Sequence, residues 1–238
     1  MSRLRIILIA LGAMAVVCAS ATPASAHVSV VSGAGVANAT QEVHFGVGHG
    51  CAGADTVRVR VEIPASVTSV RPMPSDFGRI SVEKDAAGLV SAVVWQKADA
   101  DFLDADLAYY KLTIRLKVPN QPFTAVFFPA HQVCRAADGT MTTVRWVGLP
   151  GDPVVDGGAS DEPAPALVVV PARRAGWNKL TVAAAVSDLA TFFADALIVW
   201  KGAAAWSPNP ATTDLIGATA GVTALTALAA NDEIWVRY

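Results

Sequence analysis

The sequence predicts an all-β protein, an antiparallel β-sandwich followed by a small C-terminal β-rich unit of α+β type. Between residue 27 and about residue 150, short segments alternate apolar and polar side chains with the period of two that is typical of half-buried strands. Turns rich in proline, glycine or aspartate separate these segments, as in antiparallel sandwiches. Beyond about residue 172 a helical pattern appears between strand-like segments.

The strands of the first region end at clear turn signals. Residues 57–63 and residues 111–118 alternate apolar and polar side chains. Pro64 and Pro119 follow these segments, and a proline cannot continue a paired strand. Residues 80–84 and 89–95 flank the turn-forming residues 85–88, which predicts a hairpin. Further strand candidates are residues 123–128, 142–147 and 167–170.

Composition divides the chain into two units. Residues 151–166 are rich in glycine, proline and aspartate, and we interpret them as a linker or long loop. We therefore expect one domain at 27–171 and a second at 172–238. In the second unit, strands are expected at 177–182, 196–200 and 233–238, and a helix at 187–194 with Ser187 as its cap.

The first 26 residues have the order of a secretory signal peptide. A short basic stretch at residues 2–5 precedes an apolar run at 6–19, and the small tripeptide 24–26 (ASA) follows. Cleavage after Ala26 makes His27 the first residue of the mature chain. The predicted location is the periplasm or the extracellular space.

Composition and motifs exclude several functions. The net charge is −2, and the mature part contains no cluster of lysine and arginine, so nucleic acid is not an expected partner. No nucleophile elbow, zinc-protease motif or phosphate-binding loop is present, so an enzyme is not predicted. The apolar segment 215–230 is short and contains threonines, and we do not expect it to span a membrane.

Two cysteines, Cys51 and Cys134, remain after the signal peptide is removed, since Cys18 lies within it. An even pair in an exported protein favours a disulfide because the compartment is oxidising. The alternative is a copper–thiolate site.

An N-terminal histidine offers two nitrogen donors to one metal ion. The α-amine and the imidazole of His27 can close a single chelate ring, and nitrogen-rich tetragonal sites favour Cu(II). The alternative is that a histidine follows the cleavage site by chance. If the amine is a ligand, affinity should fall in acid, because the proton that it holds up to about pH 7.7–8 must leave.

Several short segments follow one another in a characteristic order. They are residues 26–30 (AHVSV), 49–51 (HGC), 61–64 (VEIP), 70–74 (VRPMP), 83–85 (EKD) before Gly88 and Trp95, 128–134 (FPAHQVC) and 145–146 (RW). Together they span about residues 26–171 and resemble the YcnI-type family of exported bacterial copper-binding proteins. Residues after 171 lie outside this resemblance.

The resemblance implies an immunoglobulin-like β-sandwich that holds Cu(II) in a single-histidine brace. Carried over residue by residue, His27 supplies the amine and the imidazole, Glu83 of the EKD segment supplies the carboxylate, and Trp146 is the indole near the metal. The other acidic candidates are Glu42, Asp101 and Asp104.

The predicted function is Cu(II) binding by a periplasmic copper chaperone or buffer, whose partners are the copper ion and other periplasmic or membrane copper-handling proteins. A second imidazole, from His44, His49 or His131, would instead indicate a copper-dependent oxidative enzyme. A third possibility is a metal-free sandwich used for adhesion or as an envelope scaffold.

Overall fold

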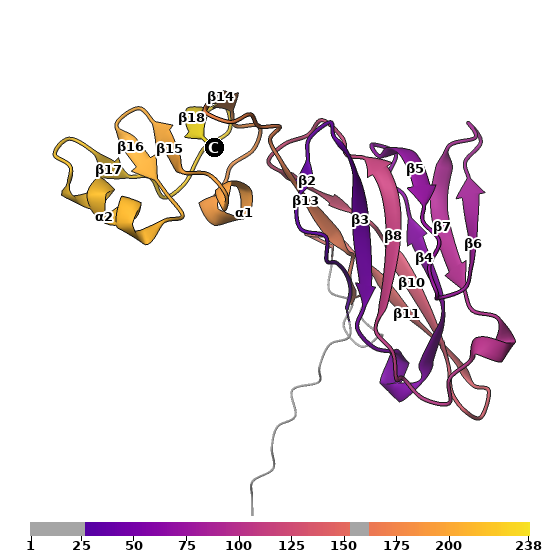
Figure 1. The fold of residues 1–238 in the computed structure, drawn as a ribbon. Coiled ribbons are helices and arrows are strands. Elements are labelled where there is room, and N and C mark those ends of the chain that lie inside the picture. Colours follow the sequence, from indigo (N-terminus) through magenta and orange to yellow (C-terminus); the bar gives the residue numbers. More distant parts are fainter. Residues whose placement is uncertain (1–26, 153–161) are drawn as a thin grey trace, which may run out of the picture.

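The computed structural model describes residues 27–152 and 162–238 (Figure 1). The predicted signal peptide and most of the predicted linker lie outside these residues. The first body contains β1 (Val28–Val30), β2 (Gly35–Val36), β3 (Thr40–Val47), β4 (Asp55–Glu62), β5 (Thr68–Pro72), β6 (Arg79–Lys84), β7 (Val90–Gln96), β8 (Tyr110–Lys117), β9 (Thr124–Phe127), β10 (Ala130–Arg135), β11 (Met141–Gly148), β12 (Glu162–Pro163) and β13 (Ala166–Val170). It also has two short 3₁₀ turns, η1 (Cys51–Gly53) and η2 (Asp99–Asp101).

These strands form a β-sandwich, which confirms the predicted all-β fold class. One layer has the strand order β1-β3-β8-β5, and the other has the order β12-β11-β10-β4-β7-β6. A smaller sheet, β2-β13-β9, completes the body. Neighbouring strands pair antiparallel except β11 with β12 and β13 with β2. Among these described strands, β6–β7 and β10–β11 are hairpins, and most other consecutive strands lie in different sheets.

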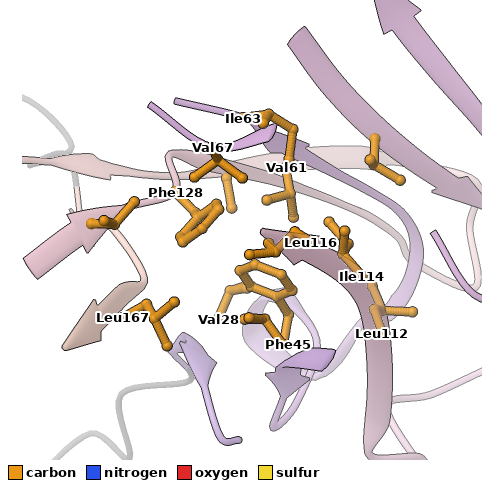
Figure 2. Close-up of a cluster of buried hydrophobic side chains, with 14 of the residues drawn as sticks. Val28, Phe45, Val61, Ile63, Val67, Leu112, Ile114, Leu116, Phe128 and Leu167 are labelled. Atoms are coloured by element: carbon orange, nitrogen blue, oxygen red, sulfur yellow. The ribbon is translucent and has the colours of Figure 1, made fainter. Parts of the chain in front are cut away.

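The core lies between the two large sheets because alternate side chains of each strand point inward. In β8 the inward residues Leu112, Ile114 and Leu116 have no exposed surface. Phe45 of β3 meets Phe128 edge to face, with ring centroids 5.3 Å apart (Figure 2). Each such side chain contributes about 1.5–3 kcal/mol by leaving water.

The strands predicted from alternation are present with small shifts at their ends. Residues 57–63 fall within β4 and the residue after it, and residues 111–118 match β8 in the same way. The predicted hairpin is formed by β6 and β7. Its turn is held by Asp85, whose side chain accepts hydrogen bonds from the amides of Ala87 and Leu89.

The C-terminal unit is a five-stranded sheet with two helices, as the predicted α+β type requires. Its sheet has the order β14-β18-β15-β16-β17. The elements are β14 (Trp177–Thr181), α1 (Leu189–Phe193), β15 (Ile198–Lys201), β16 (Ala204–Trp206), α2 (Pro210–Ala218), β17 (Thr223–Ala224) and β18 (Glu233–Arg237).

The sequence predicted one of the two helices and a cap for it. Helix α1 lies where a helix was expected, but Asp188 caps it rather than Ser187, because the Asp188 carboxylate accepts the amide of Ala190. Helix α2 was not predicted, although Asn209 caps it and Pro210 opens it. Across the described ranges, no helix combines the length and apolarity needed to cross a bilayer.

Phe123 joins the two bodies. Its ring belongs to the core of the C-terminal unit, 5.6 Å from the ring of Phe192 and 5.9 Å from that of Phe193. Its backbone belongs to the sandwich, since its amide donates to the carbonyl of Val169. Phe123 therefore links the small sheet β2-β13-β9 to helix α1.

Candidate metal centre

His27 lies at the start of the sandwich, next to the indole that the sequence predicted. It directly precedes β1, and Val28 pairs with Val47 of β3. The ring of His27 lies 5.3 Å from the ring of Trp146, centroid to centroid, at an interplanar angle of 48°. His27 is exposed, whereas Trp146 is 3% exposed. A buried indole therefore contacts an accessible imidazole.

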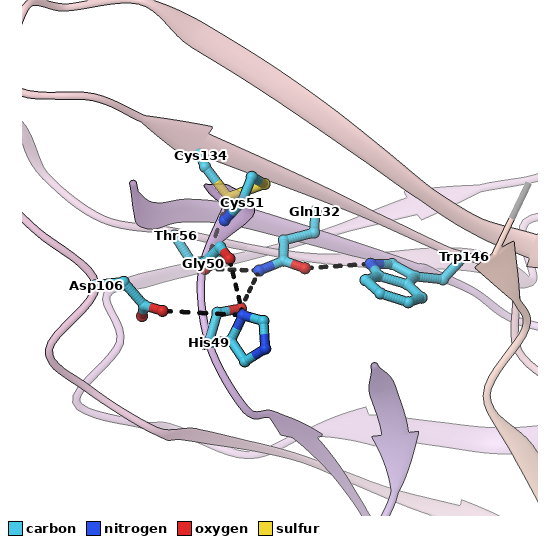
Figure 3. The surroundings of a disulfide bond; sticks show 8 residues. All are labelled: His49, Gly50, Cys51, Thr56, Asp106, Gln132, Cys134 and Trp146. Atoms are coloured by element: carbon cyan, nitrogen blue, oxygen red, sulfur yellow. Dashed lines mark hydrogen bonds and ion pairs between the residues drawn. A yellow bond between two sulfur atoms is a disulfide. The ribbon is translucent and has the colours of Figure 1, made fainter. Parts of the chain in front are cut away.

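A buried hydrogen-bond network holds Trp146 in place (Figure 3). The indole Nε1 donates to Oε1 of Gln132 at 3.1 Å. The amide nitrogen of Gln132 donates in turn to the carbonyl of His49 and to the hydroxyl of Thr56, both at 2.8 Å. Gln132 is 1% exposed, so these bonds fix which way its amide faces. Sequence reasoning gave Gln132 no role, although it lies in the FPAHQVC segment.

The disulfide predicted from the cysteine pair is present between Cys51 and Cys134, with their Cα atoms 5.7 Å apart. It fastens η1 to β10, two residues from Gln132. The chain after β3, which includes His49, is therefore held beside the Trp146 network (Figure 3). Because the two sulfurs are bonded to each other, neither is a thiolate ligand in this structure.

The structure does not bring Glu83 to His27 and Trp146. Glu83 lies on β6, and β10, β4 and β7 separate that strand from β11. At about 4.8 Å per strand, Glu83 is roughly 19 Å from Trp146 across the sheet. The EKD segment forms a hairpin at the far edge of the sandwich, which explains the separation.

Glu83 instead belongs to a charged cluster on the outer face of its sheet. Its carboxylate accepts three hydrogen bonds from Arg60, at 2.8–3.1 Å. Arg60 also bonds Glu62, and His131 lies 3.4 Å from the same Glu62 oxygen. The hydrogen bonds from Arg60 hold the pKa of Glu83 below its ordinary value of 4.5. Burial acts to raise the pKa of Glu62, but Arg60 outweighs it and the pKa is lowered.

The other acidic candidates lie on different elements. Glu42 lies on β3, five residues before Val47, which is about 17 Å along an extended strand. Asp101 ends η2, after β7. Asp104 lies in the loop that follows, and Asp106 of the same loop approaches His49, at 4.0 Å.

Glu162 is the acidic residue whose backbone the sheet places opposite Trp146. Strand β12 pairs parallel with β11, and the two partners in register are Trp146 and Glu162. Neighbouring strands of a sheet lie about 5 Å apart, so Glu162 is near Trp146 in the sheet. Glu162 is half-buried. Sequence reasoning missed it because it assigned residues 151–166 to a linker.

Comparison with known proteins identifies the domain that carries these residues. The family model described as "Domain of unknown function (DUF1775)" matches residues 27–169. The chain belongs to this family. The match to the DUF1775 domain begins at His27 and ends within β13, so it contains the whole His27–Trp146 site and leaves the C-terminal unit outside.

A solved structure is also similar to this chain. It is described as an uncharacterized protein from Nocardia farcinica that reveals an immunoglobulin-like fold, and it is 24% identical. The similarity covers 61% of this chain and 99% of the Nocardia farcinica chain, with a TM-score of 0.48. No curated protein matches this chain.

The remaining histidines of the DUF1775 domain have different surroundings. His44 shares a hydrogen bond of 3.0 Å with Thr113 on the neighbouring strand, and His131 lies in the Arg60 cluster. His49 lies two residues after Val47, which pairs with Val28. Since β1 and β3 pair antiparallel, the residues after Val47 continue alongside His27. Of these three histidines, only His49 lies in that segment.

The DUF1775 domain has one nitrogen donor and one oxygen donor on elements next to Trp146, although within residues 27–152 and 162–238 no group of three or more His, Cys, Asp or Glu side chains is arranged to hold a metal ion. His27 carries the imidazole, and Glu162 carries a hard oxygen donor on the strand beside Trp146. Such donors suit a Cu(II) ion, because imidazole and carboxylate both bind it in tetragonal geometry. The buried indole contacts the ring of His27, which is itself exposed.

Proposed function

We propose that this DUF1775 protein is an exported Cu(II)-binding protein of YcnI type that works as a copper chaperone or buffer. The observation that supports it best is the contact between the ring of His27 and that of Trp146 at the first residue of the family match. In this proposal the precursor is cut after Ala26. The free amine and the imidazole of His27 then bind the ion together, and Glu162 replaces Glu83 as the carboxylate ligand.

The donor set explains how such a protein would take up and release copper. Two nitrogens and a carboxylate hold Cu(II), whereas Cu(I) prefers sulfur ligands. Reduction would therefore weaken binding and allow transfer to a sulfur-rich acceptor. Trp146 and its hydrogen bond to Gln132 keep one side of the site dry and rigid.

The amine requirement gives the decisive test. Protein that begins at His27 is titrated with Cu(II) against a competing chelator, beside protein with one extra residue ahead of His27. The extra residue should weaken binding by more than about 100-fold, which exceeds the 10–100-fold loss typical of an outer-shell partner. Undiminished affinity of the extended protein would refute the brace.

Two glutamates form a matched pair for the carboxylate. Glu162→Gln should weaken Cu(II) binding by about 10-fold or more, since a charged donor becomes a neutral amide. Glu83→Gln should leave the affinity unchanged, because Glu83 lies at the far edge of the sheet. The reverse result would restore Glu83 as the ligand and remove Glu162.

A copper-dependent oxidative enzyme is the second candidate, and the position of His49 after β3 favours it over a metal-free scaffold. Electron paramagnetic resonance of the Cu(II) form distinguishes the chaperone from the enzyme. The single brace predicts one coordinated imidazole and no change in the spectrum of His49→Ala. A signal from two imidazoles that His49→Ala reduces to one would instead support the enzyme. Absence of Cu(II) binding would leave the metal-free scaffold.

A further inference from the structure

The C-terminal sheet has one packed face and one face that carries tryptophans. In β18, Ile234 and Val236 are fully buried and belong to the core that contains helix α1. Trp235, between them, must point to the opposite side and is 49% exposed. Because Ile234 and Val236 pack in the same core as Leu189 and Phe193 of α1, the side of Trp235 is not the one that α1 covers.

The strand register gathers three tryptophans on this outer face. Trp235 of β18 and Trp200 of β15 are direct partners across two neighbouring strands. On the other side of β18, Trp177 of β14 pairs with Arg237 and is 51% exposed. The indoles are therefore stepped across three neighbouring strands, one per strand. We call Trp177, Trp200 and Trp235, with Lys179 and Arg237, the tryptophan face.

The tryptophan face carries an excess of positive charge. Lys179 is paired with Glu233 on the neighbouring strand, 2.8 Å away. The guanidinium of Arg237 lies over the ring of Trp177, 6.0 Å from its centroid, and within residues 27–152 and 162–238 it has no carboxylate in ion-pair contact. Within these residues Arg237 therefore has no matching carboxylate, and its guanidinium contacts the indole of Trp177 instead.

We propose that the tryptophan face binds an acidic polysaccharide. Each sugar ring has an apolar face that stacks on an indole and a polar rim that forms hydrogen bonds. The tryptophan face offers both, because indoles alternate with charged side chains along its strands. A row of rings stepped across neighbouring strands suits a linear polymer that presents the same ring repeatedly. The unmatched charge of Arg237 complements a uronate carboxylate, which gives a bidentate pair.

Exposure of the indoles supports a binding role. Trp177 and Trp235, each about half exposed, keep a large apolar surface in water beside the more buried Trp200, and patches of this kind mark interaction sites. The face lies in the unit outside the family match, so this site is separate from the His27 centre and does not depend on copper binding. A protein built in this way would hold its sandwich close to an acidic glycan.

Affinity electrophoresis of the full chain tests the proposal. The protein runs in native gels that contain alginate, a polyuronate, or hydroxyethylcellulose, a neutral glucan. We expect retardation in alginate only. Trp177→Ala and Trp235→Ala, made separately, should each raise the apparent Kd for alginate on the order of 30-fold, as truncated aromatic hot spots do. Arg237→Gln should also weaken it.

Controls separate binding from folding and from self-association. Leu215→Ala removes another exposed apolar side chain, on helix α2, and should keep full retardation. Thermal melts show whether each variant is folded. Two separate tryptophan variants, on different strands, keep the test valid if one of them does not fold. Retardation in neither gel or only in the neutral gel would overturn the proposal. A dimer in sedimentation that Trp235→Ala dissolves would also overturn it and indicate a second copy.

Discussion

Gln132 is a buried residue whose amide serves three neighbours at once. It accepts from Trp146 and donates to Thr56 and to the carbonyl of His49. Gln132→Leu keeps the volume but leaves those polar groups without partners in the core. We expect a loss of about 2–4 kcal/mol in the free energy of unfolding, measured by urea denaturation. Gln121→Ala, at an exposed glutamine, should change it by no more than about 0.5 kcal/mol.

The ion pair of Glu83 with Arg60 makes the stability of the fold depend on pH. The pKa of Glu83 is lowered in the folded protein, chiefly by its hydrogen bonds from Arg60. The resulting stability is fully present above the ordinary pKa of 4.5 and is lost as the pH falls through the lowered folded value. Because the side chain of Glu83 is 43% exposed, the effect should not exceed about 1 kcal/mol.

Arg60→Gln should raise the pKa of Glu83 toward 4.5, as followed by NMR titration of the side-chain carboxyl. Arg79→Gln removes an exposed arginine from the same strand as Glu83 and serves as the matched control. An unchanged pKa of Glu83 in Arg60→Gln would show that the cluster does not persist in solution.

At the scale of elements, the disulfide connects η1 to β10 across 83 residues of chain. In the chain-entropy model, closing a loop of this length stabilises the fold by about 4–5 kcal/mol. The double variant with Cys51→Ser and Cys134→Ser should lose that amount, seen as a lower urea midpoint. Reductant should lower the midpoint of the natural protein to that of the variant and leave the variant unchanged. A reductant effect on the variant would contradict this.

Local signals in the sequence were enough to place individual strands and one hairpin. Alternation and a closing proline predicted β4 and β8, and the turn at residues 85–88 predicted the β6–β7 hairpin. The sheet order is different, because it depends on which distant strands become neighbours. Motif order predicted that His27 and Trp146 belong together, but it could not show that β12 reaches β11 or that β6 lies at the opposite edge. The predicted carboxylate therefore lay far from His27.

One residue, Phe123, belongs to both bodies of the protein. Phe123 has a backbone φ of 66°, which is costly for a bulky residue and persists only when the surroundings fix it. Here its amide is held by Val169 and its ring by Phe192 and Phe193, on opposite sides of the junction. Stability of the C-terminal unit should therefore depend on a side chain that the sandwich supplies.

Phe123→Ala tests this dependence, because it opens a cavity in the second core while the His27–Trp146 contact lies in the first. We expect a loss of about 3–5 kcal/mol confined to the C-terminal unit. Hydrogen exchange should show faster exchange at residues 177–237 and unchanged protection in β3, β4 and β8. Phe102→Ala, which removes a ring stacked on Arg135 of the sandwich, should leave the C-terminal unit unchanged. An equal increase in hydrogen exchange in both bodies of Phe123→Ala would mean that they unfold as a single unit. The C-terminal unit could then not be removed without unfolding the sandwich.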